Sequence, residues 1–211
     1  MTGTEIPAIP ARLTHRPSVG GVVHPWVNVR LADGGVDFRV AHRKKWLSAW
    51  RDRLCQVCGQ ALTPPVVLLC GPNQLARLLF DEPAVHPECG LYASRACPMV
   101  AGRRTAYAAS VPVAQGRRGR ACPEPGCDCA GWVPDDDKPH SYGAPAHDWY
   151  AVWARGYILA FDPSGDLDGG AVHPDDVLRV RIVSRGGEGR VYRSLTGVEV
   201  AALVTDPAVT A

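Results

Sequence analysis

Two groups of metal-ligand residues constrain this chain more than any other feature of its sequence. The first joins Cys55 and Cys58 to the later pair His86 and Cys89, and the second is a compact group of three cysteines between residues 122 and 129. A CxxC turn directs both sulfur atoms to the same side of a tight loop, and thiolates and imidazoles at such spacings converge on a tetrahedral Zn²⁺. We therefore expect the chain to fold around metal.

The eight cysteines are sufficient for two sites. Cys70 ends the apolar run 66–70, where a thiol behaves as a small buried hydrophobe. The other seven cysteines and His86 make eight ligands, enough for two closed four-ligand sites of the structural kind and thus two Zn²⁺ per chain. The first predicted site contains Cys55, Cys58, His86 and Cys89. The second contains Cys122, Cys127 and Cys129, with Cys97 as the fourth ligand and His140 or His147 as substitutes.

Disulfide bonds are the competing use of so many cysteines, and they require an oxidising compartment. Residues 1–10 show no basic start followed by an apolar core, so no secretory signal is visible. No apolar stretch approaches the roughly 20 residues needed to cross a bilayer. We expect a soluble cytoplasmic protein with reduced cysteines and no membrane partner.

The 22 glycines and 19 prolines among 211 residues predict many irregular loops, which gain most from metal staples. We expect an α+β fold: a small zinc-stapled part over 1–100, an Arg/Gly-rich linker or loop over 101–121, and a mostly β part over 122–211 that begins with the second cysteine group. Strands are expected at 19–31, 36–40, 66–70, 149–161, 177–183 and 191–195. Helical segments are expected at 41–54, 73–80 and 89–96, and a strand or short helix at 198–204.

The net charge of +2 hides an asymmetry. Residues 1–125 carry 16 basic and 8 acidic side chains, whereas residues 126–211 carry 7 and 13. Either the two halves attract each other, or the basic half faces a polyanion. The expected helix over 41–54 concentrates positive charge around apolar residues at helical spacing. Its candidate nucleic-acid contacts are Arg43, Lys44, Lys45, Arg51 and Arg53.

Two resemblances accompany these patterns. Residues 55–97, with a CxxCG knuckle and a second ligand pair at the start of a helix, resemble a treble-clef zinc finger. Nearly the whole chain resembles a group of uncharacterised cysteine-rich proteins from actinobacteria and their phages, a resemblance that implies a host or phage setting and no particular activity. The stretches that carry it are Ile6–Pro10, Arg16–Gly21, His24–Val27, Cys55–Gly59, Pro65–Leu69, Ala93–Gly102, Cys127–Trp132 and Trp149–Trp153.

Three classes of function fit the sequence. The first is a non-catalytic zinc-stabilised module that contacts nucleic acid or a protein through the basic helix. The second is an HNH-like metal-dependent nuclease, which also uses a CxxCG knuckle but needs a histidine on the strand after it; residues 64–72 contain none. The third is thiol chemistry at Cys97 or at the pair Cys127 and Cys129. We favour the binding module and assign no catalytic residue.

Overall fold

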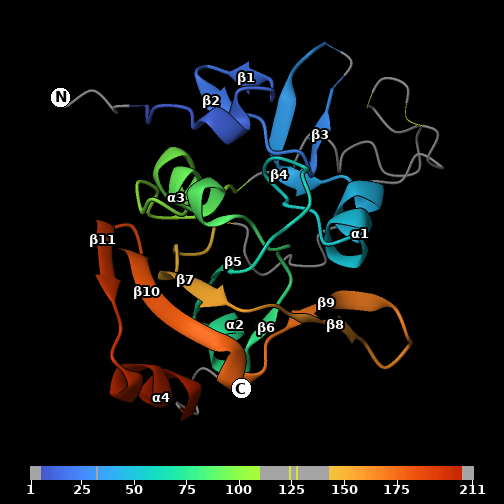
Figure 1. Ribbon diagram of the computed structural model, residues 1–211. Helices are drawn as coiled ribbons and strands as arrows, with labels where there is room; N and C mark the ends of the chain where they lie inside the picture. Colours follow the sequence, from blue (N-terminus) through green and yellow to red (C-terminus); the bar gives the residue numbers. More distant parts are fainter. Residues whose placement is uncertain (1–5, 32, 110–123, 125–126, 128–142, 206–211) are drawn as a thin grey trace.

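The computed structural model describes residues 6–31, 33–109, 124, 127 and 143–205, and these form an α+β fold of short strands and helices (Figure 1). The described helices have at most ten residues, and none of them is long and apolar enough to cross a membrane. In chain order the elements are η1 (Ala11–Leu13), β1 (Ser18–Val19), β2 (Val22–Val23), β3 (Asn28–Arg30), β4 (Val36–Ala41), α1 (Arg43–Arg51), β5 (Val66–Cys70), α2 (Pro72–Arg77), β6 (Leu79–Phe80), α3 (Pro87–Ala96), β7 (Trp149–Ala154), β8 (Ile158–Phe161), β9 (Leu167–Ala171), η4 (Pro174–Asp176), β10 (Val177–Arg185), β11 (Gly189–Ser194) and α4 (Gly197–Thr205).

The single strand expected over residues 19–31 is in fact three short strands. β1 and β2 form a hairpin whose turn is made by Gly20 and Gly21, with φ of 58° and 79°. Glycine adopts this left-handed conformation without steric cost, which explains the break. β3 and β4 form the second hairpin, in which Arg30 lies opposite Val36. The Leu31 N–H donates to the Gly35 carbonyl (2.8 Å) where the two strands are joined.

α1 is shorter than the helix expected over 41–54. It begins after His42, whose backbone is extended, and ends at Arg51. Arg53 has a φ of 53°, so the chain has left the helix before the first knuckle. Trp50 is fully buried on the inner face of α1, whereas Lys44 and Arg51 are exposed. The apolar periodicity therefore identified the buried face correctly but overestimated the length.

Strands from both ends of the chain share two antiparallel sheets. The larger sheet has the order β11-β10-β7-β5, and the smaller has the order β6-β9-β8. β5 pairs with β7 along its full length, with Val66 opposite Ala154, and β6 pairs with β9. The parts expected over 1–100 and 122–211 thus contribute strands to the same sheets. Residues 198–204, expected to form a strand or a short helix, lie in α4 beside the larger sheet (Figure 1).

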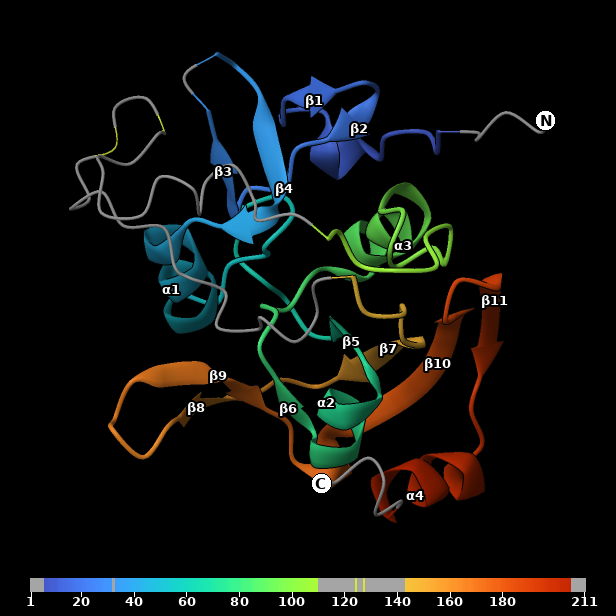
Figure 2. The ribbon, with the colours of Figure 1, turned by 180° about the vertical axis from the view of Figure 1, so that it is seen from behind.

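β5 is buried on both faces, which explains its continuous apolar sequence. One face belongs to a core around Trp50 and Phe80, and the other belongs to a core around Val85 and helix α3. In both ribbon views α3 lies on one side of β5 and α2 on the other (Figures 1 and 2). The first face carries Val66, Leu68 and Cys70, and the second carries Val67 and Leu69. Cys70 is 1% exposed, as its apolar context predicts.

The smaller sheet packs very closely on α1 at Gly170 of β9. A Cβ atom at this position would lie 2.3 Å from the Trp50 ring, which is itself fully buried and stacks edge-on against Tyr157 at 5.0 Å. Such an approach is shorter than any normal van der Waals contact, and the ring has no free space into which it can move. Only glycine fits this position without displacing Trp50.

We predict that Gly170→Ala lowers the free energy of unfolding by roughly 1–3 kcal/mol, because overpacking displaces the Trp50 ring. Gly156→Ala is the matched control, since a Cβ there meets nothing within 4 Å. Its effect should stay within about 0.5 kcal/mol. Urea unfolding, monitored by tryptophan fluorescence, measures the free energy of unfolding of each variant. Equal stability of the two variants would contradict the packing described here.

Candidate metal centre

The four residues of the first predicted site converge at one buried point. The ligand atoms of Cys55, Cys58, His86 and Cys89 all lie within 4.8 Å of one another, and every one of these residues is buried. Two segments about 30 residues apart supply them: the loop after α1, and the first turn of α3 with the residue before it. Three thiols and one imidazole in this arrangement are able to hold a metal ion.

Backbone hydrogen bonds shape the CxxC loop. The Cys55 N–H donates to the Gln60 carbonyl (2.8 Å), the Gly59 N–H donates to the Cys55 carbonyl (2.8 Å), and the Gln60 N–H points at Cys58 Sγ (3.4 Å). Gly59 has a φ of 77°, and a Cβ there would lie 2.7 Å from the Trp26 ring. Both its conformation and its contact with Trp26 therefore require glycine.

The imidazole of His86 is oriented by a hydrogen bond on its far side. Nε2 lies 3.0 Å from the Ala61 carbonyl, and Nδ1 lies 3.5 Å from Cys58 Sγ. Because a carbonyl oxygen only accepts, Nε2 carries the proton and Nδ1 presents its lone pair to the thiols. Histidine ligands of metals are commonly held by such a bond, which fixes the tautomer.

Cys89, the partner of His86 in the second ligand pair, lies in the first turn of α3. Pro87 occupies the first helical position, where its missing N–H costs nothing, and Cys89 follows two residues later. Unsatisfied N–H groups make the start of a helix favourable for negative charge, so α3 supports a thiolate at Cys89. The second ligand pair thus lies at the start of a helix, as the sequence predicts.

The three thiols strongly influence one another. Hydrogen bonds from Cys55 and Cys89 lower the pKa of Cys58 to about 2, while burial raises the pKa of Cys55 to about 11. Contact with the Cys55 and Cys58 thiols raises the pKa of Cys89 above its ordinary value. The buried cluster by itself thus favours a single negative charge. A bound divalent cation would favour three negative charges, because each thiolate would be attracted to the cation and this attraction would outweigh the repulsion among the thiolates.

An outer set of contacts ties the N-terminal segment to the cluster. Arg12 of η1 forms an ion pair with Glu88, and its Nη1 donates to the Gln60 side chain (2.9 Å). His15 Nε2 lies 3.0 Å from the Cys58 carbonyl. These contacts connect η1 to both the CxxC loop and α3. Sequence analysis did not find them, because the partners are 43 to 76 residues apart.

The residues of the second predicted site are described only in part. Cys122, Cys129 and His140 lie outside the described residues. Cys97 ends α3, where burial raises the pKa of its thiol. Cys127 Sγ lies 3.1 Å from His42 Nε2, a contact that sequence analysis missed because 85 residues separate the partners. His147 is the other substitute ligand. Its ring centroid lies 5.7 Å from that of Tyr107 and 4.8 Å from that of Trp149.

The five basic residues expected at a nucleic-acid interface differ in their surroundings. Arg43 lies over the Trp46 ring, and Lys45 forms an ion pair with Glu124. Arg53 stacks on Tyr157 and donates to its carbonyl (3.2 Å). Lys44, Arg51 and Arg53 are the exposed members of this set.

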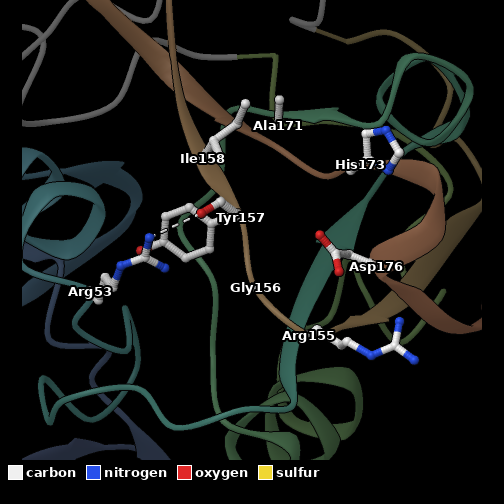
Figure 3. A pocket seen from close by; sticks show the side chains of 8 residues that line it. All are labelled: Arg53, Arg155, Gly156, Tyr157, Ile158, Ala171, His173 and Asp176. Carbon is white, nitrogen blue, oxygen red and sulfur yellow. Dashed lines mark hydrogen bonds between the residues drawn. The ribbon is translucent and has the colours of Figure 1, made fainter.

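A shallow cavity of about 270 Å³ lies where the loop after α1 meets the β7–β8 connection and β9 (Figure 3). The Arg155 side chain on its rim donates to the Asp175 carbonyl (2.6 Å). Figure 3 shows the Arg53 guanidinium against the Tyr157 ring, whereas the Arg155 guanidinium extends away from that ring. This cavity does not gather charged groups toward one ligand, so we assign it no role.

No family model, curated protein or solved structure matches this chain. The candidate site therefore has to be interpreted from its own chemistry. Its four ligands are all protein side chains and all buried, as in metal sites that support a fold. The strand after the CxxC loop, β5, contains no histidine, and His86 belongs to the cluster. The arrangement offers no support for an HNH-like centre.

We predict that Cys58→Ser removes the metal bound at this cluster and lowers the free energy of unfolding by roughly 4 kcal/mol or more, because loss of a structural metal is among the most destabilising changes. Metal content by elemental analysis and thermal unfolding measure the two effects. Cys70→Ala is the control, since it also removes a buried thiol but lies on the opposite face of β5. A folded Cys58→Ser chain with unchanged metal content would contradict the assignment.

Proposed function

We propose that this protein is a non-catalytic, zinc-stabilised binding module that contacts nucleic acid through the exposed basic face of α1. The observation that carries the proposal is the closed, buried cluster of three cysteines and one histidine beside that helix. Four protein ligands complete a tetrahedral shell and leave no position for water or substrate. The metal is accordingly assigned to folding, and binding is assigned to the surface.

Zinc is the ion that best suits this donor set. Thiolates with an imidazole in tetrahedral arrangement favour Zn²⁺ over the hard cations, which prefer oxygen ligands. The order of features, with a CxxC loop, strand β5 and a ligand pair at the start of α3, supports a treble-clef-like interpretation of this part. We also propose a second ion at the cysteine group of residues 122–129, giving two zinc ions per chain.

The exposed face of α1 supplies a basic stripe. Lys44, Ser48 and Arg51 occupy positions i, i+4 and i+7, which lie on one side of a helix. Trp50 on the opposite side fixes the helix to the core. Lys and Arg on such a stripe neutralise phosphates and release counterions, without any need for base contacts.

Two ion pairs of the described residues each join charges of the same half. Lys45 pairs with Glu124 inside the basic half, whereas Arg185 pairs with Asp148 inside the acidic half. Pairs of this kind do not reduce the positive excess of residues 1–125 or the negative excess of residues 126–211. An anionic partner would account for the positive excess of the basic half, and nucleic acid fits it best.

We predict that the double variant Lys44→Ala and Arg51→Ala weakens binding to duplex DNA and flattens its salt dependence. Each phosphate contact contributes about −0.9 to the slope of log K against log salt, so the slope should change by roughly one to two units. Fluorescence anisotropy with a labelled duplex, between about 50 and 200 mM salt, measures both quantities.

The matched control is the double variant Arg77→Ala and Arg95→Ala, which removes the same charge from exposed positions on α2 and α3. Its salt slope should equal that of the unmodified chain. Equal effects of both double variants would indicate nonspecific attraction. Absence of binding to DNA and RNA at about 50 mM salt, with the metal intact, would leave a protein partner as the alternative.

A further inference from the structure

The contact between His42 and Cys127 joins an imidazole in a fixed position to a thiol far away in the sequence. His42 is 4% exposed and lies at the N-terminal cap of α1. Its N–H donates to the Val27 carbonyl (2.7 Å), and its own carbonyl accepts from the Trp46 N–H (2.8 Å). With the backbone held on both sides, Nε2 lies 3.1 Å from Cys127 Sγ. The hairpin and the helix thus position the ring before any ligand binds.

Glu124 holds Cys127 against the same region. The Cys127 N–H donates to the Glu124 carbonyl (3.2 Å). The Glu124 carboxylate forms an ion pair with Lys45 of α1 and accepts from the Arg30 N–H of β3 (3.5 Å). The side chains of Lys45 and Glu124 are 20% and 14% exposed, so water screens their attraction less than at an open surface. This ion pair brings the second cysteine group to His42.

The distance between the two groups is close to that of two ligands sharing one ion. Ligand atoms about 2.05 and 2.3 Å from a tetrahedral zinc lie about 3.5 Å apart. Cys58 Sγ and His86 Nδ1 of the first centre are 3.5 Å apart, and the His42 and Cys127 atoms need to separate by only about 0.4 Å more to match. A small side-chain rotation achieves this.

The sequence around Cys127 supplies the remaining thiols. Cys129 follows two residues later in the sequence. Cys122 precedes by five residues. Both lie outside the described residues, so their contribution here comes from spacing alone. Three thiols and a buried imidazole match the donor set of the first centre.

We infer that His42 and Cys127 are two of the ligands of the second zinc ion. His42 then replaces Cys97 as the fourth ligand. Burial after the end of α3 raises the pKa of the Cys97 thiol, although the nearby backbone of Val100 and Met99 favours its charged form. This inference rests on the second zinc site proposed above, but not on nucleic-acid binding.

Metal content of four single variants tests the assignment. The unmodified chain should hold two zinc ions, and His42→Gln and Cys127→Ser should each hold one. Cys97→Ser and His147→Gln are the controls, because they alter the alternative ligands suggested by sequence, and each should retain two. Elemental analysis after gel filtration gives the stoichiometry. Retention of the first ion shows that a variant is still folded around its metal centre.

A fifth variant covers the case in which His42→Gln fails to fold. His42→Cys supplies a thiolate in place of the imidazole and should still bind two metal ions. With Co²⁺ in place of zinc, its thiolate-to-metal charge-transfer absorption should exceed that of the unmodified chain by the contribution of one additional thiolate. An unchanged absorption would show that residue 42 does not contact the metal.

Three results would overturn the inference. They are two zinc ions in His42→Gln, one zinc ion in the unmodified chain, and loss of the second ion in Cys97→Ser with retention in His42→Gln. If the unmodified chain holds one zinc ion and iodoacetamide modifies Cys127 at neutral pH, the pair is a reactive thiol beside an imidazole. Loss of DNA binding with two ions retained would count against the proposed function alone.

Discussion

Three thiols and one imidazole share a single buried point, and the N-terminal half of the structure is arranged around them. Burial opposes more than one negative charge there, whereas a divalent cation favours three. The CxxC loop and the start of α3 supply these groups, and η1 contacts both segments. A metal ion bound to Cys55, Cys58, His86 and Cys89 would hold the loop and the helix together.

β5 connects this centre to the rest of the protein. Its two faces belong to different cores, one beside the metal ligands and one beneath Trp50 of α1. Because β5 pairs with β7 along its length, the part of the fold around the ligand cluster is hydrogen-bonded directly to a strand of the C-terminal part. Disruption of the ligand cluster is therefore expected to affect the position of β5, and through it the packing of α1.

Not all of the basic residues around α1 belong to the proposed contact surface. Of the five basic side chains around α1, Arg43, Lys45 and Arg53 contact neighbours within the fold, and each such contact has a structural role. Lys45 in particular holds Glu124 and hence Cys127 beside His42. Lys44 and Arg51 are exposed on one side of α1 and are the residues assigned to the proposed interaction. The proposed second metal site and the proposed contact surface thus both involve α1.

The sequence alone predicted the first ligand cluster and the apolar strand β5, because both depend on spacing between near neighbours and on local helix and strand preferences. It also predicted the buried face of α1, but not where the helix ends; there the chain turns through the left-handed conformation of Arg53, whose side chain lies over the distant Tyr157. Tertiary structure alone decided that β5 pairs with β7 and that His42 faces Cys127. These contacts join residues about 85 apart, and sequence spacing carries no information on which of many distant partners will meet once the chain is compact.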